Sequence, residues 1–340
     1  MSDIDIRMET GEAEALIARV LQQSGTAPDN AASVARALVA AEVDGQAGHG
    51  FSRVAAYAAQ AKSGKVAGHA VPRIETGAAA LLNVDAGNGF AFPAIDAAID
   101  ALTALVPATG VAAAFIRRSH HCGQLGAHVE RLANHGFVAL MMANSPPAMA
   151  PWGGAAALFG TNPIAFAAPR REGLPLVIDL SLSKVARGKV MAASKLGKPI
   201  PEGWALDSEG RPTTDPDAAL KGTMLPAGDA KGAMLALIVE ILAGTLTGAN
   251  HSFEATSFFD AEGAPPGVGQ ILIAFDPGRT AGPGFPGRLE MLLAAMTDQE
   301  GVRLPGSNRA LRREAAARDG VRIPAKLHAE IMALAGSLPD

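Results

Sequence analysis

The sequence predicts an α/β protein in which both ends of the chain contribute to a second, mostly helical lobe. Apolar residues recur at helical spacing over about the first 45 residues, short apolar runs divided by Gly, Pro and Asn begin near residue 70, and helical patterns return from Arg288 onward. Strands and helices therefore alternate only in the middle. We expect an α/β domain at residues 73–285 and a helical lobe made of residues 1–72 and 286–340.

The N-terminal segment is predicted to form two helices. Apolar residues fall on one helical face at Ala13, Leu16, Ile17, Val20 and Leu21. A second helix should begin at residues 27–30, where Pro28 suits a first helical turn, and end near Asp44 and Gly45.

The middle of the chain alternates between strand and helix patterns. Strands are predicted at residues 79–84, 111–116, 137–142, 176–178 and 271–275. Helices are predicted at residues 91–105, 124–135 and 231–246. The last of these is almost wholly apolar, so we expect it to be central.

The tail from Arg288 onward is predicted to be helical and to pack on the N-terminal helices. The stretch 278–287 is rich in Gly and Pro, which makes it the best candidate for a linker between the two lobes.

Composition narrows the class of partner. The 340 residues are 49% apolar but only 4% aromatic, with a net charge of −4 and both signs mixed throughout. No broad cationic face is expected for nucleic acid or anionic lipid, so a small-molecule partner is favoured. The N-terminus is acidic, and no run approaches the roughly 18 uninterrupted apolar residues of a membrane span. We expect a cytoplasmic protein that does not enter a membrane.

The cysteine and histidine content gives no metal site. Cys122 is the single cysteine, which excludes an intrachain disulfide and a cysteine-based zinc site. Adjacent His120 and His121 should project in different directions, which disfavours chelation of one metal by both. Cys122 could be a nucleophile, but no dedicated base is visible, and a small packing residue beside a ligand loop is the favoured interpretation.

The usual dinucleotide-binding fingerprint is absent. Gly87-Asn88-Gly89 lacks the third glycine at the required place, and no phosphate-binding P-loop occurs. A nicotinamide cofactor would therefore bind on other architecture.

His49 and Arg53 form the first pair that could carry chemistry. They are four residues apart, which places them on one side of a helix or within reach of one ligand in a looser turn. Imidazole exchanges a proton near neutrality, and guanidinium binds a carboxylate through two parallel hydrogen bonds. The pair suits a 2-keto or 2-imino acid. A surface histidine and a solvated arginine remain the alternative.

Residues 119–126 form a second candidate site. They follow a predicted strand and precede a predicted helix, and unpaired N–H groups at a helix N-terminus bind anions. A cofactor pyrophosphate is a reasonable occupant.

Polar loops recur later, at residues 159–163, 178–184, 225–232 and 304–309, and positive charge gathers at 187–189. Each loop alone is typical of an ordinary capped turn. Their order along the chain is more informative.

That order resembles the malate/L-lactate dehydrogenase family, which also includes ureidoglycolate and sulfolactate dehydrogenases and cyclic-ketimine (piperideine- and pyrroline-2-carboxylate) reductases. The resemblance covers nearly the whole chain. Its most specific parts are residues 119–123, 150–163, 179–189 and 225–232. It implies a non-Rossmann NAD(P)-binding fold with a large mixed sheet, and a homodimer in which the helical lobes complete the active site.

The resemblance also implies roles for individual residues. His49 would be the proton donor or acceptor, with His121 as the alternative catalytic base. The substrate would be held by Arg53, Thr161, Arg187, Gly188 and Lys189. The cofactor would be held by His121, Cys122, Gly123, Gln124, Leu125, Asp179, Leu180, Ser181, Lys231, Gly232, Pro305, Gly306, Ser307, Asn308 and Arg309.

One departure from the family pattern bears on the substrate. The family usually has Ser directly before the first His, where this chain has Gly48. A relay of Ser, His and Asp proposed for the ketimine-reducing branch could not be completed here, which weakens that alternative. The positive charge of Arg53, Arg187 and Lys189 exceeds what a monocarboxylate requires.

The sequence therefore favours NAD(P)-dependent hydride transfer at C2 of a dianionic 2-hydroxy or 2-keto acid of the 3-sulfolactate or malate type. A cyclic-ketimine reductase is the first alternative, and a catalytically silent nucleotide-binding dimer is the second. We favour NADP over NAD. Whether Arg309 and Ser307 reach a 2′-phosphate should decide between the two cofactors.

Overall fold

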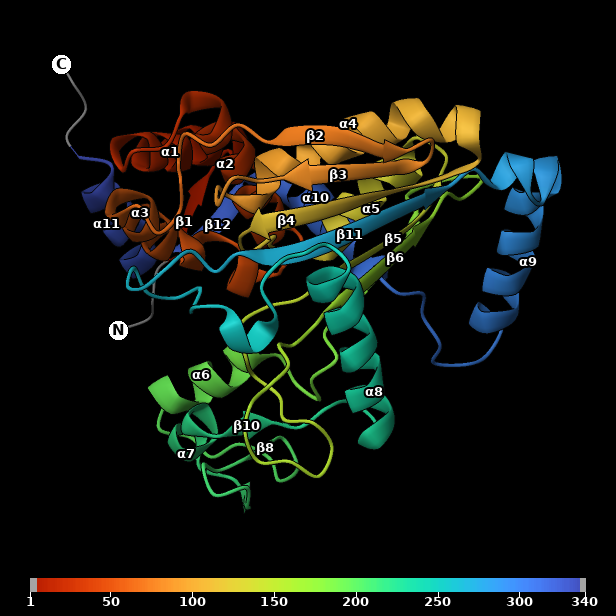
Figure 1. The fold of residues 1–340 in the computed structure, drawn as a ribbon. Coiled ribbons are helices and arrows are strands. Elements are labelled where there is room, and N and C mark those ends of the chain that lie inside the picture. Colours follow the sequence, from red (N-terminus) through yellow and green to blue (C-terminus); the bar gives the residue numbers. More distant parts are fainter. Residues whose placement is uncertain (1–4, 337–340) are drawn as a thin grey trace.

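A mixed sheet forms the centre of the computed structural model, which describes residues 5–336 (Figure 1). In spatial order its seven strands are β2 (Arg73–Ala78), β3 (Leu81–Asp85), β4 (Val111–Ser119), β11 (Val268–Phe275), β5 (Val138–Ala143), β6 (Ile164–Ala168) and β7 (Leu176–Leu180). β3 and β4 are parallel, whereas the other neighbouring pairs are antiparallel. The predicted mixed α/β fold is confirmed.

β11 joins the two halves of the sheet, although it comes late in the sequence. It lies between β4 and β5, with Ile271 opposite Phe115 on one side and Met142 on the other. Side chains alternate across a strand, so Leu272 faces one core cluster and Ile271 faces another. Both faces of the sheet are therefore buried, and helices must cover each of them.

One face is covered by α4 (Ala91–Thr109) and α5 (Leu125–Asn134), the two helices predicted at residues 91–105 and 124–135. By length and composition alone, α4 could cross a membrane. Its apolar side instead includes Ile95, Ile99 and Leu102, which are buried in the main core. The chain thus uses α4 as a core helix of the α/β domain.

The opposite face carries α8 (Ala230–Val239), which continues as a π-helical turn, η3 (Glu240–Thr245) (Figure 1). The helix is present as predicted, but the prediction that it is central is wrong. Ala236, Val239 and Ala243 pack inward. Its outer side is exposed at Met234, Leu235, Leu237, Ile238 and Ile241. The sequence is apolar all round, yet the described part of this chain covers only one side.

The helical lobe combines segments from both ends of the chain. Its helices are α1 (Thr10–Gln23), α2 (Pro28–Val43), α3 (Val54–Ser63), α10 (Ser307–Asp319) and α11 (Ala325–Leu334). Strand β1 (Asp5–Met8) pairs with β12 (Val321–Pro324) and joins the two terminal segments. Ile17, Leu38 and Ile331 meet in one core cluster, so the lobe has a hydrophobic interior of its own.

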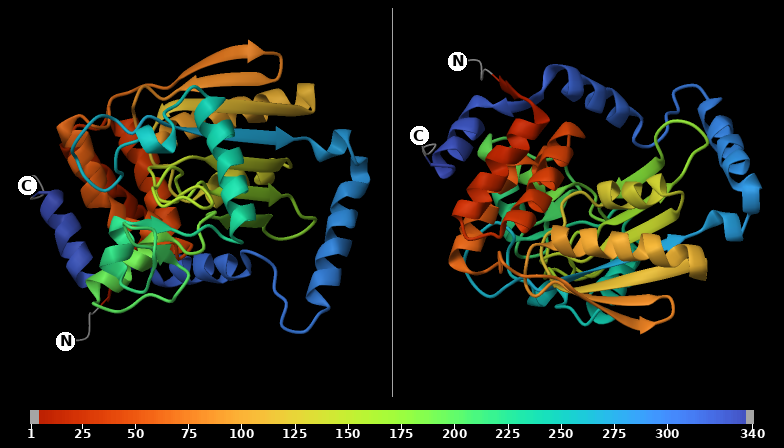
Figure 2. Two further views of the ribbon diagram at one scale, coloured as in Figure 1. Left: turned by 60° about the horizontal axis from the view of Figure 1, so that its bottom comes forward. Right: turned by 90° about the horizontal axis from the view of Figure 1, so that it is seen from above.

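The tail does not pack as predicted over its whole length. α10 and α11 lie against the N-terminal elements, but α9 (Phe285–Thr297) stands apart at the far end of the sheet (Figures 1 and 2). The predicted linker region forms short turns between β11 and α9. Met291 and Leu292 on α9 are 65% and 59% exposed, so no apolar surface within the described residues covers them.

A small unit hangs below the sheet in Figure 1. It contains α6 (Arg187–Lys195), α7 (Pro216–Lys221) and a three-stranded sheet of β8 (Ala205–Leu206), β9 (Pro212–Thr213) and β10 (Thr223–Met224). Its apolar residues share a core cluster with the α8 side of the large sheet.

Candidate active site

Two short 3-10 turns position the first pair of candidate residues. Turn η1 (Ala47–His49) ends at His49, and η2 (Phe51–Arg53) ends at Arg53. Gly50 separates them, and a Cβ there would come within 2.2 Å of the Glu42 carboxylate, which accepts a 3.0 Å bond from the N–H of Phe51. Glycine therefore permits the close approach that holds this segment against α2.

The two candidate histidines are in direct contact. His49 Nδ1 lies 3.2 Å from His121 Nε2, and the rings stack with centroids 5.1 Å apart and planes 12° from parallel. His121 comes from the turn that follows β4. The fold therefore joins two motifs that are distant in the sequence.

His121 and its neighbour His120 point to different partners. The Nδ1 atom of His121 lies 2.5 Å from the hydroxyl oxygen of Tyr57 on α3, whereas His120 Nε2 lies 2.6 Å from Gln60 Oε1. Phe258 packs on both imidazoles, each at a centroid distance of 5.2 Å. The two adjacent imidazoles therefore project toward different partners, as their adjacency in the sequence predicts.

Burial controls the charge of these imidazoles. Desolvation, and then the positive charge of Arg53, lowers the pKa of His49 to about 4. The pKa of His121 is lowered well below its usual range, first by burial and then by Arg53, His49 and His120. Both rings are therefore neutral in the free protein near neutral pH, which is the state required of a general base.

Arg53 is a partly buried cation without an acidic partner among the described residues. Its Nε donates to the carbonyl oxygen of Gly48 at 2.7 Å, and its guanidinium carbon lies 4.4 Å from the centre of the Phe259 ring. The Nη1 atom is buried and makes no hydrogen bond with any residue that the structure describes. Because burial also lowers the pKa of this guanidinium, an incoming carboxylate would satisfy both its charge and its free donor.

Cys122 lies beside these histidines but is not an activated nucleophile. Its thiol is buried, and burial followed by the charge of Asp179 raises its pKa to about 12. A thiol in this state is not ionised near neutral pH. The packing interpretation of Cys122 is therefore favoured by the structure.

A pocket of about 350 Å³ lies next to this site. It is lined by the end of α2, the end of β7 and the loop before α10, that is by Asp44, Gln46, Val177–Asp179 and Arg303–Arg309 together with Arg312. Five of the predicted cofactor residues, Pro305 to Arg309, thus share a pocket with Asp179. The turn after β4 reaches the same place, because Gln124 Nε2 donates to Asp44 at 3.1 Å and the N–H of Gly126 donates to Asp179 at 2.7 Å.

Two groups that the sequence analysis expected to bind anions, the N-terminus of α5 and Arg309, already have partners in this pocket. The N-terminus of α5 is not free, since the carboxylate of Asp179 already accepts from Gly126. Arg309 is not free either, because it forms ion pairs with Asp44 at 3.5 Å and Glu130 at 3.7 Å. Arg303, which the sequence analysis did not single out, is exposed at the pocket and has no acidic partner within the described residues.

Two of the predicted substrate residues, Thr161 and Arg187, contact the same loop, the one that contains Ser145 and Pro147. Thr161 Oγ1 lies 3.4 Å from Ser145 Oγ, and Arg187 Nη1 donates to the carbonyl oxygen of Pro147 at 3.3 Å. Gly188 and Lys189 are exposed in the first turn of α6. No hydrogen bond or ion pair within residues 5–336 links these four residues directly to His49 or Arg53.

The remaining predicted cofactor residues do not line the pocket beside Asp179. Leu180 is 46% exposed, Ser181 contacts Ser183 at 3.1 Å, and Lys231 is exposed on the first turn of α8. Gly232 has a packing role instead, because a Cβ there would lie 1.9 Å from the carbonyl oxygen of Ala227.

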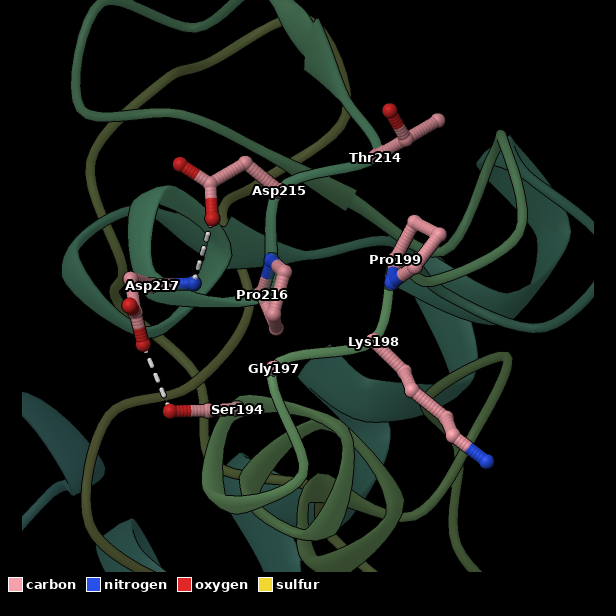
Figure 3. Close-up of a pocket in the computed structure, with 8 residues that line it drawn as sticks. All are labelled: Ser194, Gly197, Lys198, Pro199, Thr214, Asp215, Pro216 and Asp217. Atoms are coloured by element: carbon pink, nitrogen blue, oxygen red, sulfur yellow. Dashed lines mark hydrogen bonds between the residues drawn. The ribbon is translucent and has the colours of Figure 1, made fainter.

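A pocket of about 410 Å³ in the small unit contains none of the predicted residues (Figure 3). It lies between the end of α6 and the start of α7, where Ser194 donates to Asp217 at 2.5 Å. Asp215, rather than a ligand, caps the N–H of Asp217 at 3.0 Å. This pocket is not part of the site built around His49.

Comparisons with known proteins give a consistent picture. The sequence model of the malate/L-lactate dehydrogenase family matches residues 8–332. The NADP(+)-dependent (2R)-3-sulfolactate dehydrogenase of Chromohalobacter salexigens is 57% identical over 304 residues, covering 89% of this chain and 91% of that protein. The Δ1-pyrroline-2-carboxylate/Δ1-piperideine-2-carboxylate reductase of Pseudomonas aeruginosa is 41% identical and covers 97% and 99% of the two chains.

A solved structure supports the same assignment. The crystal structure of Δ1-piperideine-2-carboxylate reductase from Pseudomonas syringae pv. tomato superimposes with a TM-score of 0.92 at 39% identity. The match covers 97% of this chain and 99% of that one.

Proposed function

The chain belongs to the malate/L-lactate dehydrogenase family, and on that premise we propose that it is an NADP-dependent oxidoreductase acting at C2 of a dianionic 2-hydroxy acid of the (2R)-3-sulfolactate type. One observation carries this proposal. The guanidinium of Arg53, whose buried Nη1 has no hydrogen-bond partner among the described residues, lies beside a neutral histidine whose second ring nitrogen, Nε2, is available for a proton.

The residues divide the work between binding and proton transfer. Arg53 pairs with the substrate carboxylate and so fixes C2 and its hydroxyl relative to His49. During oxidation His49 accepts the hydroxyl proton at Nε2, and during reduction it returns a proton to the keto oxygen. NADP, when bound, supplies or takes up the hydride. A well-placed acid/base group contributes about 10²- to 10⁴-fold to such a reaction.

A second anionic group on the substrate has a candidate partner in Arg187. This guanidinium is partly buried, and its pKa is lowered by that burial. A partly buried cation is stabilised when an anion pairs with it. Lys189, a second cation, lies two residues away in the sequence. We assign the second anionic group of the substrate, a sulfonate or carboxylate, to this side of the site. The 57% identical relative that acts on 3-sulfolactate supports the sulfonate.

NADP is the proposed cofactor because cations without acidic partners remain at the pocket beside Asp179. Arg309 is held in ion pairs, whereas Arg303 is exposed and unpaired among the described residues. Arg303 is therefore the better candidate for a 2′-phosphate, with Ser307 nearby in the same loop. NAD is the alternative cofactor.

Reduction of a cyclic ketimine is the second candidate function. It is favoured by the full-length likeness to pyrroline- and piperideine-2-carboxylate reductases, at 41% identity. Arg53 would then grip the carboxylate of the ring. Gly48 weighs against this reading, because it supplies no hydroxyl beside His49.

A substrate panel tests the proposal directly. Purified protein is assayed for NADPH formation with (2R)-3-sulfolactate, malate and lactate, for NADH formation with the same acids, and for NADPH consumption with the cyclic imines. We expect the highest kcat/KM with (2R)-3-sulfolactate and NADP. Preference for a cyclic imine would assign the second function, and NADPH binding without turnover on any of these compounds would assign a regulatory dimer.

We also propose that the protein works in the cytoplasm as a homodimer, without nucleic acid or membrane partners. The exposed apolar side of α8 supports a partner subunit, since apolar patches of this kind mark protein interfaces. The apolar residues on the projecting helix α9 support it as well. The net charge of −4 gives no support to nucleic-acid binding.

A further inference from the structure

We propose that His49 and His121 act as a single acid/base unit that shares one proton, and that Tyr57 is the positioning residue at its inner end. The inference rests on the proposed function, because it names the groups that hold the substrate proton. It also resolves a choice left open by the sequence, in which either histidine could be the base. In this arrangement only His49 meets the substrate, and His121 and Tyr57 act through it.

Three side chains form a continuous hydrogen-bonded chain. His49 Nδ1 lies 3.2 Å from His121 Nε2, and His121 Nδ1 lies 2.5 Å from the Tyr57 hydroxyl. Both ring nitrogens of His121 are thus engaged, and among contacts of residues 5–336 the Nε2 atom of His49 is the one imidazole nitrogen of the pair left for a substrate. Tyr57 is fully buried, and Phe90 and Phe92 pack against its ring, so the hydroxyl is held in place.

The positions of the protons determine which atom donates and which accepts in each hydrogen bond once the pair is protonated. When the substrate hydroxyl gives its proton to His49 Nε2, the proton on His49 Nδ1 can pass to His121 Nε2. His49 is then neutral, and His121 is an imidazolium whose Nδ1–H donates to the Tyr57 oxygen. Every step is reversible, and no group other than the substrate and the two imidazoles gains or loses a proton. Tyr57 remains a phenol, which agrees with a pKa raised by burial.

The surroundings leave the Tyr57 oxygen as the group that accepts from the protonated pair. Histidines that carry a proton are commonly oriented by a carboxylate. Within residues 5–336 no carboxylate bonds to His49 or His121, and Gly48 offers no hydroxyl. The charged and titratable groups that face the pair are Arg53, from the same segment as His49, and His120, next to His121. Arg53 is cationic and His120 is neutral, so neither stabilises a positive charge on the pair.

Kinetics of Tyr57→Phe provide the first test. The variant keeps the ring and its packing but removes the acceptor, so the protonated pair is destabilised and its pKa falls. We expect the acid limb of kcat/KM for oxidation to move to lower pH by about one unit, the scale of one hydrogen bond to a charged group. Reduction needs the protonated pair, so the kcat/KM for reduction should fall about tenfold near neutral pH. The kcat/KM for oxidation should fall less. A packing defect would lower both directions alike without moving the limb, and that result would overturn the inference.

A spectroscopic test does not depend on turnover. In ¹⁵N-histidine-labelled protein, Tyr57→Phe should change the nitrogen shifts of His49 as well as those of His121, although Tyr57 does not contact His49. The matched control is Ser119→Ala, which removes another buried hydroxyl, next to His120 in the sequence, that has no hydrogen-bond partner in the described part of the chain. It should leave the His49 shifts unchanged. Unchanged His49 shifts in Tyr57→Phe would contradict the proposed hydrogen-bonded connection between His49, His121 and Tyr57.

The amino-acid sequence allows a second variant, because Tyr57 is its only tyrosine. Biosynthetic replacement by fluorotyrosine alters this one phenol, makes its oxygen a weaker acceptor and preserves its shape. The acid limb should move in the same direction as in Tyr57→Phe, by a smaller amount. Failure of the proposed function would appear separately, as wild-type protein that turns over no family substrate while the nitrogen shifts still respond to Tyr57→Phe.

Discussion

At the scale of single residues, the charge of His49 depends on whether Arg53 has found its carboxylate. Burial and the neighbouring guanidinium hold the pKa of His49 at about 4 in the free protein. A carboxylate paired with Arg53 cancels part of that positive charge, so the pKa of His49 should rise when substrate binds. The free enzyme therefore keeps its base neutral, and the complex brings the base closer to working pH.

This difference predicts two separate acid limbs for oxidation. The pH profile of kcat/KM reports the free enzyme and that of kcat reports the complex. Since oxidation requires neutral His49, we expect the acid limb of kcat to lie at higher pH than that of kcat/KM. Initial rates across the range in which the protein stays folded measure both limbs. Coincident limbs would mean that Arg53 does not meet the substrate carboxylate.

Part of the site was predictable from residue types and spacing, and part was not. His49, Arg53 and His121 stand in glycine-bearing segments with chemistry that suits a 2-hydroxy acid. Tyr57 was missed, although it lies four residues after Arg53 and its position as the single tyrosine was visible. Phe258 and Phe259 could not be found, because their contact with His121 and Arg53 depends on a loop folding back over α3.

At the scale of elements, that loop is attached by one buried lysine. Lys65 follows α3, and its ammonium donates to the carbonyl oxygens of Ser257 and Asp260 at 2.8 and 3.1 Å and to the Asp260 carboxylate at 3.0 Å. The loop between these contacts carries Phe258 and Phe259. Lys65 thereby connects the helical lobe to the aromatic cover over the site.

Lys65→Met should detach the loop that carries Phe258 and Phe259 from the helical lobe. Loss of the ammonium leaves two carbonyl oxygens without their donor, at a cost of about 1–3 kcal/mol in the free energy of unfolding. The KM for substrate should rise, because Phe259 no longer supports Arg53. Urea unfolding and steady-state kinetics measure the two effects. Asp260→Asn is the control, since the Asp260 side chain is half exposed and both backbone contacts remain; an equal loss in this variant would argue against the attachment.

The outer side of α8 gives a prediction about assembly. Ile238 is 49% exposed in the middle of its apolar face, so we expect it to be buried in a dimer. Ile238→Glu should shift the protein from dimer to monomer in light scattering after size exclusion. Leu196→Glu is the matched control, because Leu196 is also apolar and is 68% exposed, but lies at the end of α6. Dimers that persist in Ile238→Glu would remove α8 from the interface.

Elements with regular apolar patterns were predicted closely, and exposed ones were not. α4, α5 and β4 follow the predicted ranges because each buries one side in the main core. The predicted strand at 79–84 coincides with β3 over residues 81–84, but its first two residues form the turn after β2. β2 has no apolar alternation to find, because all six of its residues are exposed. Helix α8 was assigned correctly but misplaced, since an apolar helix can face either a core or a partner.

At the scale of the whole molecule, long-range pairings decide the fold. β11 enters the middle of the sheet, and β1 pairs with β12 across nearly the full length of the chain. Local patterns predicted the α/β class and the helical lobe, but no local pattern specifies which distant strand lies beside which. The family resemblance supplied the mixed sheet for that reason.

The fold also buries neutral histidines, which predicts acid sensitivity. Burial lowers the pKa of His120 to about 3 and that of His128 to about 4. Between these values and the usual value near 6.5, the unfolded chain takes up protons that the folded chain does not, so stability falls as pH drops through this window. Each group contributes a slope of up to about 1.4 kcal/mol per pH unit.

Thermal unfolding as a function of pH measures this effect. The Tm should decrease progressively below about pH 6.5, where free histidine begins to take up protons. His128→Gln removes one of the buried histidines with a lowered pKa and should make the decrease less steep. A Tm that stays constant from neutral pH down to about pH 4 would show that these histidines protonate as readily in the folded protein as in the unfolded chain.

The central claim is that His49 exchanges the substrate proton in an enzyme whose cofactor is held elsewhere. The most direct measurement compares wild type with His49→Ala, using (2R)-3-sulfolactate oxidation for kcat and NADPH fluorescence for cofactor binding. We predict a loss of about 10²- to 10⁴-fold in kcat with NADPH affinity unchanged. Full activity in His49→Ala would contradict the account and move the proton to another group.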